Sequence, residues 1–357
     1  MNVRQIRVTA GLFLFIPLSV FSHHSNSEFD QSVDTEFEGK VTQVLWRNPH
    51  ILIDVATTDE SGSETVWHLE GSAVSAQHRQ GVKAGLIQEG QQIRVAGWAS
   101  TRRDKHMLVN HVLLPDSVEL LVGNVREPRW SETSHGGERF MGLAASPDEP
   151  LDVSLGEAER IFRVWVRATG SWYFKGADAY QLTEEAIVAK ANWNEFEDNP
   201  LLNCTPPGMP ALMGNPYPMQ FVQLDDKIEL RFEEFDVVRT IYLGQSGNAA
   251  QEPLSHLGYS IGQWEDNTLV VKTSRINWPY FDRVGVPQSN AVEVVERFTA
   301  IEIDNQDKLI YELTISDPAT LIEPFTWDGE FVGKDGEVVE KYGCTLDESV
   351  AEYSLDR

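Results

Sequence analysis

The chain of 357 residues is poor in cysteine and in basic residues, and it lacks the short motifs that mark most cofactor-dependent enzymes. It has no P-loop, dinucleotide fingerprint, Cys-x-x-Cys, haem-attachment motif or His-Glu-x-x-His. These absences count against nucleotide-binding, thiol-redox and zinc-protease classes. No apolar run reaches the roughly 20 residues that a membrane-spanning helix needs.

The shortage of basic residues restricts the partners that we expect. The chain has 29 Lys and Arg against 55 Asp and Glu. This balance argues against binding to nucleic acid or to an anionic membrane, and it can attract cations. Ten tryptophans argue against a disordered acidic chain. The length exceeds the usual size of one domain, so we expect two.

The first 22 residues have the pattern of a secretory signal peptide. Arg4 and Arg7 precede an apolar run from Val8 to Phe21, and residues 20–22 suit a cleavage site. We expect a periplasmic or secreted protein that starts near His23, with 27 basic and 55 acidic residues and no membrane insertion after cleavage. The alternative is an uncleaved anchor.

The two cysteines, Cys204 and Cys344, are expected to form a disulfide, because a lone pair in an exported protein is usually oxidised. Such a long loop gains about 4–5 kcal/mol in the chain-entropy model. The alternative is two unpaired buried thiols.

The first half of the chain alternates between apolar and polar residues, as half-buried strands do. A short helix, with Ser72 as its N-cap, is expected between the third and fourth strands. The order of five strands and one helix is that of an OB-fold barrel, although another small five-stranded barrel has the same pattern. The predicted strands span 36–48, 51–57, 64–69, 91–98 and 107–114, and the predicted helix spans 72–80.

Several motifs in residues 23–118 resemble one family of small exported bacterial proteins of unknown function. These are HHSNSEFD, FEGKVTQVLWRNPHILIDV, TVWHLEGSAVSAQHRQGV and IQEGQQIRVAGWAS. The family shares His-His-Ser, Trp-x-Asn-Pro-His and Trp-x-x-Glu-Gly. The resemblance implies an OB-like barrel and export, and it assigns no chemistry.

The second half predicts a larger antiparallel barrel or curved sheet, lipocalin-like in outline, over residues 156–348. Residues 119–155 have the composition of a linker, and 349–357 form a tail. A helix capped by Thr183 is expected over 183–194. The proline-rich run 199–221 is expected to be an ordered loop against the barrel. Predicted strands span 161–167, 220–224, 227–232, 237–243, 259–264, 269–273, 292–304, 308–316, 325–332 and 337–344.

Residues 195–345 resemble a second exported bacterial β-rich family, also without assigned chemistry. The resemblance lies in CTPPGMPALMGNPYPMQF, LGYSIGQWEDNTLVVKT, DRVGVPQS, VVERF and LTISDPATLIEPFTW. Members often have His where this chain has Gln288, and a second His near Glu293. A catalytic or ligand role for those histidines would therefore not carry over.

Aromatic and polar residues in the second half could line the mouth of the barrel and bind a small apolar or aromatic molecule. The alternative is that Glu–Arg pairs bridge neighbouring strands. Gly258-x-Ser260-x-Gly262 matches a hydrolase elbow but lies in a strand pattern, so we reject it as a nucleophile. The candidate ligand-binding residues are Tyr217, Arg239, Trp264, Trp278, Tyr280, Phe281 and Asp282.

Histidines near the expected mature N-terminus could bind copper. A terminal His23 offers an α-amine beside an imidazole, a pair that suits Cu(II). His24, His50 or His68 could supply a third nitrogen. The alternative is a flexible terminus with scattered surface histidines.

Three functions remain open. The first is an exported binding or accessory protein for a small molecule. The second is a copper protein that uses His23, and the third is a hydrolase or isomerase that acts in the barrel with acidic residues. The sequence carries no signal for an oligomeric state.

Overall fold

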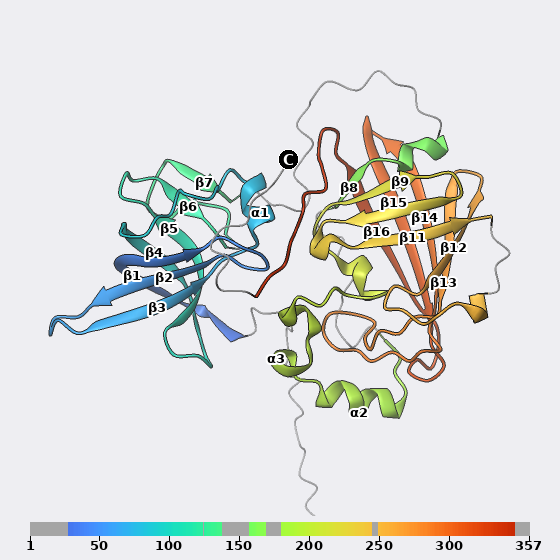
Figure 1. Cartoon of the computed structure of the whole chain (residues 1–357), viewed down its shortest axis with the longest axis horizontal. Helices are drawn as coiled ribbons and strands as arrows, with labels where there is room; N and C mark the ends of the chain where they lie inside the picture. Colours follow the sequence, from blue (N-terminus) through green and yellow to red (C-terminus); the bar gives the residue numbers. More distant parts are fainter. Residues whose placement is uncertain (1–27, 124, 138–156, 169–179, 245–248, 347–357) are drawn as a thin grey trace, which may run out of the picture.

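The computed structural model describes residues 28–123, 125–137, 157–168, 180–244 and 249–346. The described chain forms two β-barrels, the first blue to cyan and the second green to red in Figure 1. The predicted fold class, mainly β with a small barrel followed by a larger one, is confirmed. None of the described helices is both long enough and apolar enough to cross a membrane.

The first barrel has five strands and the strand order of an OB-like fold. Its sheet runs β3-β2-β1-β4-β5, and a parallel pairing of β3 with β5 closes it. Helix α1 (Val74–Arg79) lies between β3 and β4, as predicted. The strands are β1 (Phe29–Leu45), β2 (Leu52–Thr58), β3 (Glu64–Glu70), β4 (Gln92–Ser100) and β5 (His106–Leu113).

Two short strands extend this sheet into the range that the sequence assigns to a linker. They are β6 (Glu119–Leu121) and β7 (Ser134–Gly136), and β6 pairs with β5. The carboxylate of Glu119 accepts hydrogen bonds from the backbone N–H groups of Arg129, Trp130 and Ser131. Loop composition did not predict this attachment, because it rests on two very short strand pairings and on one buried carboxylate.

The core of the first barrel is aliphatic. Ile51, Ile53 and Val55 are fully buried, and the last two point inward on alternate positions of β2. The other members of the core are mostly Val, Leu and Ile, and they come from the other strands, from α1 and from the segments between them. Short branched side chains are enough to fill a barrel of five strands.

Helix α1 is not capped by Ser72, so that prediction is wrong. Ala73 occupies the N-cap position and offers no side-chain hydrogen bond. Instead, Asn48 Oδ1 accepts from the backbone N–H of Val74 at 2.8 Å. A residue far away in sequence therefore satisfies the helix terminus.

The second barrel is closed and has nine strands, in the order β10-β11-β12-β13-β14-β15-β16-β8-β9. The predicted hairpin is present as β12 (Tyr259–Glu265) and β13 (Thr268–Ser274). The expectation that all strands are antiparallel is wrong for β11 and β12, which pair in parallel. The other strands are β8 (Val164–Arg167), β9 (Met219–Gln223), β10 (Lys227–Phe232), β11 (Val238–Leu243), β14 (Glu293–Ile303), β15 (Gln306–Ser316) and β16 (Phe325–Gly333).

This parallel pair follows from the long connection between Leu243 and Tyr259. A tight turn can join only antiparallel neighbours, whereas a longer connection carries the chain back to start the next strand in the same direction. Helices α2 (Glu184–Asn192) and α3 (Glu195–Asp198) lie below the second barrel in Figure 1. Short 3-10 helices span Glu157–Ile161, Pro200–Asn203, Ala211–Gly214, Glu234–Asp236 and Ala249–Gln251.

The proline-rich run covers the core of the second barrel, as predicted. Met209, Leu212 and Met213 are buried in the same cluster as the inward side chains of the strands. The backbone carbonyl of Met213 accepts a hydrogen bond from the buried Arg167 of β8. The run is therefore an ordered part of the barrel.

The predicted strand 337–344 does not form. Residues 337–345, here called the strap, run between the two barrels as an extended segment, dark red in Figure 1. Side chains bind its backbone in place of a neighbouring strand. Asp236 accepts from the N–H groups of Tyr342 and Gly343, at 2.7 and 2.8 Å.

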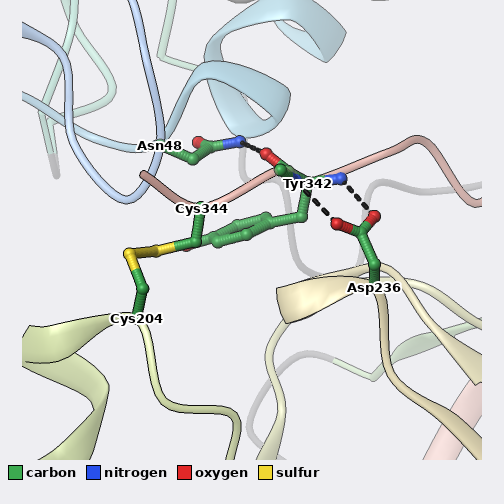
Figure 2. The surroundings of a disulfide bond; sticks show 6 residues. Asn48, Cys204, Asp236, Tyr342 and Cys344 are labelled. Carbon is green, nitrogen blue, oxygen red and sulfur yellow. Dashed lines mark hydrogen bonds between the residues drawn. A yellow bond between two sulfur atoms is a disulfide. The ribbon is translucent and has the colours of Figure 1, made fainter. Parts of the chain in front are cut away.

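The first barrel binds the strap from the other side, through the Trp-x-Asn-Pro-His motif. Asn48 Nδ2 donates to the carbonyl of Tyr342 at 2.7 Å (Figure 2). The N–H of Thr345 also donates to the carbonyl of Asn48, at 3.1 Å. The expected disulfide joins Cys204 to Cys344, with 5.7 Å between the Cα atoms. The strap thus contacts both barrels.

The ring of Tyr342 fills the space between the barrels. It is 3% exposed and belongs to a small apolar cluster with Ala73 and Ala76 of α1. Close by, Arg79 of α1 forms an ion pair with the buried Glu233 of the second barrel. Apolar contact and a charged pair therefore join the two barrels at the same place.

Candidate functional site

The interior of the second barrel holds a buried ion pair. Arg239 of β11 and Glu296 of β14 are each at most 1% exposed, and Arg239 Nη1 lies 3.0 Å from Glu296 Oε1. Arg239 also donates to the hydroxyls of Ser260 and Thr273, and Tyr311 donates to Glu296 at 2.9 Å. Both charges are thus compensated by neighbours, as buried charges must be.

The seven candidate ligand-binding residues do not all meet at one place. Arg239 lies in the core, and the Trp264 ring contacts Phe162 edge-on at 6.4 Å. The Tyr217 ring contacts Tyr342 of the strap at 5.4 Å between centroids. The three residues that do come together are Trp278, Tyr280 and Asp282.

Trp278, Tyr280, Phe281 and Asp282 belong to one segment, residues 278–282, here called the aromatic loop. Its Phe281 is fully buried, and the ring stacks on that of Tyr180 with 5.9 Å between centroids. It points into the core, whereas Tyr280 and Asp282 line a small cavity. This alternation is what an extended segment produces, because successive side chains point to opposite sides.

That cavity has a volume of about 10 Å³, which is close to the space one water molecule needs. Its walls come from the aromatic loop, from the end of α2 and from the proline-rich run. The lining residues are Trp193, Asn199, Pro200, Leu201, Pro207, Ala211, Trp278, Tyr280, Asp282, Arg283 and Gly285.

Asp282 is the polar group of interest in this cavity. Its Oδ1 accepts from the backbone N–H groups of Val284 and Val286, both at 3.0 Å. Its Oδ2 is buried and has no hydrogen-bond partner within the described ranges. Burial raises the pKa of Asp282 to about 6, although the backbone N–H groups of Val286, Val284 and Gly285 and the charge of Lys190 act in the opposite direction.

A second polar atom in the cavity wall also lacks a partner among the described residues. It is the indole N–H of Trp278, whose side chain is 7% exposed. An unpaired buried donor or acceptor costs about 1–3 kcal/mol. A carboxylate oxygen and an indole N–H in the walls of one cavity are suited to a molecule that can both donate and accept.

Gln288 connects the aromatic loop to the proline-rich run. Its Nε2 donates to the carbonyls of Met209 and Trp278, at 2.9 and 2.7 Å. Its Oε1 is buried without a partner in the described part of the chain. Glutamine thus holds together two walls of the site at the position where the resembling family often has histidine.

The outer wall comes from Trp193, which directly follows α2, and this helix buries little of its own surface. Thr183 caps it by accepting from the N–H of Ala186, as predicted, and Ala186 is the buried residue of the helix. Ile187 and Val188 are 55% and 61% exposed. A helix with so little buried apolar surface is expected to open locally at low free-energy cost.

The sequence did not indicate that Trp193, after α2, would close the cavity. The glycine at position 285 is the one feature of the sequence that is consistent with this contact, and its φ in the structure is +77°. A Cβ on Gly285 would lie 2.3 Å from the Trp193 ring. The absence of a side chain there is what lets the indole approach.

The candidate metal ligands are spread differently. His23 and His24 lie outside the described residues. His50 Nδ1 contacts the carbonyl of Gly71 at 3.0 Å, and its Nε2 lies 3.5 Å from Glu70. His68 Nδ1 lies 2.8 Å from Asp54 Oδ1. The described ranges contain no group of three or more His, Cys, Asp or Glu placed to hold one metal ion.

The fold and this geometry describe a two-barrel protein with a small cavity at the edge of its larger barrel. Residues 13–108 match the model of a family described as a family of unknown function (DUF6152). This match covers most of the first barrel. No curated protein matches the chain. The resemblance of residues 195–345 to a second exported family stays a prediction.

Proposed function

We propose that this is an exported binding or accessory protein whose small-molecule site is the cavity around Asp282. The observation that carries the proposal is the buried Oδ2 of Asp282, which has no partner within the described ranges and belongs to a residue that lines a cavity of about 10 Å³. A buried acceptor without a partner is costly, so a bound donor group would be stabilising there.

The walls determine the class of ligand. Trp278 and Tyr280 supply aromatic surface, and Pro200 and Leu201 supply apolar surface. The ligand is therefore a small molecule with an apolar or aromatic body and one hydrogen-bond donor, an amine or a hydroxyl. An ammonium group would also be favoured by the aromatic rings and by the carboxylate.

The closed cavity has room for about one water, so the ligand must displace part of the wall. Helix α2 with Trp193 is the part that can move, because Ala186 alone anchors it by burial. In the ligand-bound state, Trp193 moves outward and the ring of the ligand replaces its contact with Gly285. The single water in the closed state then occupies the position of the donor group.

Export is part of the proposal. It rests on the pattern of residues 1–22 and agrees with the disulfide between Cys204 and Cys344, because disulfides persist in oxidising compartments.

A second function, catalysis by acidic residues, is favoured by one observation. A carboxyl group with a pKa of about 6 can act as a general base or acid near neutral pH. In this version Asp282 would take a proton from a bound hydroxyl or amine. It differs from the first proposal in that a bound probe is turned over.

Three probes that share one ring test the site: benzylamine, benzyl alcohol and toluene. Binding is measured at pH 8, where Asp282 is ionised, by tryptophan fluorescence and native mass spectrometry. We expect benzylamine and benzyl alcohol to bind at least tenfold more tightly than toluene. Equal binding of the three, or binding of none up to their solubility, would overturn the proposal.

Three variants test whether the probes bind at Asp282. Asp282→Asn should weaken benzylamine at least tenfold, whereas Asp225→Asn, an exposed residue with the same change of charge, should not alter it. Trp193→Ala keeps Asp282 and enlarges the cavity, so it should bind benzylamine as tightly or more tightly. Unchanged affinity in Asp282→Asn together with weaker affinity in Trp193→Ala would contradict the site.

A further inference from the structure

The two ends of helix α2 are held in different ways. At its start, the N–H of Thr183 donates to the carbonyl of Thr320 at 3.0 Å, and the Thr183 hydroxyl donates to the carbonyl of Ala319 at 3.2 Å. Ala186, in the first turn, is the buried residue of the helix. The beginning of α2 is therefore fixed to the second barrel by hydrogen bonds and by burial.

The end of α2 is held through Lys190, the basic residue of its last turn. The ammonium of Lys190 donates to the carbonyl of Val284, two residues after the aromatic loop. It also lies 4.8 Å from the centroid of the Trp193 ring. An indole face attracts a cation, and a hydrogen bond from a charged donor is stronger than one from a neutral donor. This set of contacts, here called the latch, ties the end of the helix to the loop.

The latch lies at the small-molecule site. Trp193 and Gly285 both line the cavity, and Val284 directly precedes Gly285. The N–H of Val284 donates to Oδ1 of Asp282, so one residue binds the carboxylate through its N–H and Lys190 through its carbonyl. The charge of Lys190 also acts on Asp282. The chain thus places its own primary ammonium close to an indole ring and a carboxyl group.

A second cationic side chain in the cavity wall, Arg283, is held much more firmly. Its guanidinium forms an ion pair with Glu234, and the two side chains are 9% and 6% exposed. Breaking a buried pair is costly, because it leaves a charge without its partner. Lys190 is only partly buried and is bonded to a neutral carbonyl, so its ammonium can return to water at a smaller cost.

Opening of the site breaks the latch. The N–H of Trp193 donates to the carbonyl of Lys190 at 3.2 Å, so the indole moves outward together with the end of the helix. This movement withdraws the ammonium of Lys190 from Val284. A primary ammonium on a ligand brings the same charge and the same three N–H donors to the region that Lys190 leaves. A hydroxyl brings a hydrogen bond without the charge, and a hydrocarbon brings neither.

We propose that Lys190 is an internal stand-in for the ligand, and that the natural ligands are primary amines whose ammonium takes over the place of the Lys190 ammonium. This inference rests on the proposed function and narrows its ligand class from hydrogen-bond donors to primary amines with an aromatic or apolar body. Lys190 competes with the ligand and keeps the site closed in its absence. The helix turns about its fixed beginning at Thr183 when the exchange takes place.

Lys190→Met in the full exported chain tests the exchange, because Met keeps the helix propensity and much of the length but removes the charge. The probes are benzylamine, benzyl alcohol and toluene at pH 8. Benzylamine should bind the variant at least tenfold more tightly than the parent, since its competitor is gone. The two neutral probes should gain at most about threefold, from loss of the latch alone.

Two control variants separate charge from other effects. Lys190→Arg keeps the charge and should leave the preference for benzylamine over benzyl alcohol as it is in the parent. Lys40→Met makes the same change as Lys190→Met at an exposed position of the first barrel, and it should bind benzylamine within about twofold of the parent. Thermal melts show whether each variant is folded.

Hydrogen exchange examines the latch without any ligand. The backbone amides of α2 should exchange at least tenfold faster in Lys190→Met than in the parent, while those of the first barrel stay unchanged. Equal exchange in α2 would overturn the latch.

The binding results distinguish this inference from the function on which it rests. If no probe binds the parent or Lys190→Met, the proposed function is overturned, and the inference with it. If the parent binds benzylamine but Lys190→Met binds it no more tightly, the site stands and the exchange is overturned. An equal gain for all three probes would also overturn the exchange, because Lys190 would then only hold the helix in place.

Discussion

The two barrels fill their interiors with different chemistry. The first has an aliphatic core in which Ile51, Ile53 and Val55 are fully buried. The second combines aliphatic side chains with many large aromatic ones and encloses the Arg239–Glu296 ion pair. Barrel diameter grows with strand number, so nine strands enclose more space than branched aliphatic residues can fill.

The comparison explains why Arg239 is part of the packed interior of the second barrel and does not line a ligand cavity. In a wide barrel, a polar residue pointing inward either lines a ligand cavity or becomes part of the filling. Here its guanidinium bonds to Glu296, Ser260 and Thr273, and the interior around it is occupied. The small cavity that Asp282 lines is instead at the edge, where the aromatic loop meets the proline-rich run.

The largest expected change in the free energy of unfolding comes from breaking the buried ion pair in the second barrel. Glu296→Ala leaves Arg239 buried without its partner and should lower the free energy of unfolding by about 3–5 kcal/mol. Chemical denaturation measures this. Replacing both residues, with Arg239→Met and Glu296→Leu, should recover most of the loss.

A matched control for that change is Glu312→Ala. Glu312 is 53% exposed and lies 3.5 Å from Arg297, so we expect a change within about 0.5 kcal/mol. A small effect of Glu296→Ala, similar to that of the control, would show that the ion pair is not needed to fill the barrel.

The next prediction concerns the pH dependence of stability, which should differ in direction between a buried carboxyl of the second barrel and one of the first. The pKa of Asp282 is raised from 3.8 to about 6 in the folded chain, so its contribution to stability is full below about pH 4 and is lost as the pH rises through about 6. Relative to the parent, Asp282→Asn should therefore gain about 2 kcal/mol between pH 4 and pH 8. Urea titrations at both pH values measure it, and Asp225→Asn should show no such gain.

Glu119 of the first barrel should respond in the opposite direction. Burial by itself raises its pKa, but hydrogen bonds from Arg129, Trp130, His111 and Ser131 outweigh burial and leave the pKa lowered. Its contribution is present above the unfolded pKa near 4.5 and is lost as the pH falls through the lowered value. Glu119→Gln should thus destabilise the protein at pH 7 more than at pH 3. The same trend for both variants would contradict the comparison.

The smallest effect concerns the aliphatic core. Ile53→Val removes one buried methylene and should lower the free energy of unfolding by about 1 kcal/mol. The exposed Ile187→Val should change it very little. A loss well above 2 kcal/mol for Ile53→Val, measured by urea denaturation, would mean that the first barrel is packed more tightly than its side chains suggest.

The strands of both barrels could be predicted from the sequence, because alternation and turn residues act locally. The hairpin at Tyr259 and the strand Lys227–Phe232 follow directly from such patterns. The strap was predicted as a strand because its residues favour an extended backbone. Its backbone hydrogen bonds, however, go to the side chains of Asn48 and Asp236 and not to a neighbouring strand. The cap of α1 was missed for the same reason.

The candidate site was predicted only in part. Trp278, Tyr280 and Asp282 are close in sequence, so one aromatic loop identifies them together. Trp193 enters from a distant helix, and nothing but the glycine at 285 indicated the approach.

The strap also imposes an order of events on biogenesis. A ribosome makes the first barrel early, so the amide of Asn48 stays hydrated until the final residues of the chain emerge. Cys204 likewise has no protein thiol to react with until Cys344, 140 positions later, is made. Union of the two barrels through the strap is therefore the last step, and a premature stop near the C-terminus would prevent it.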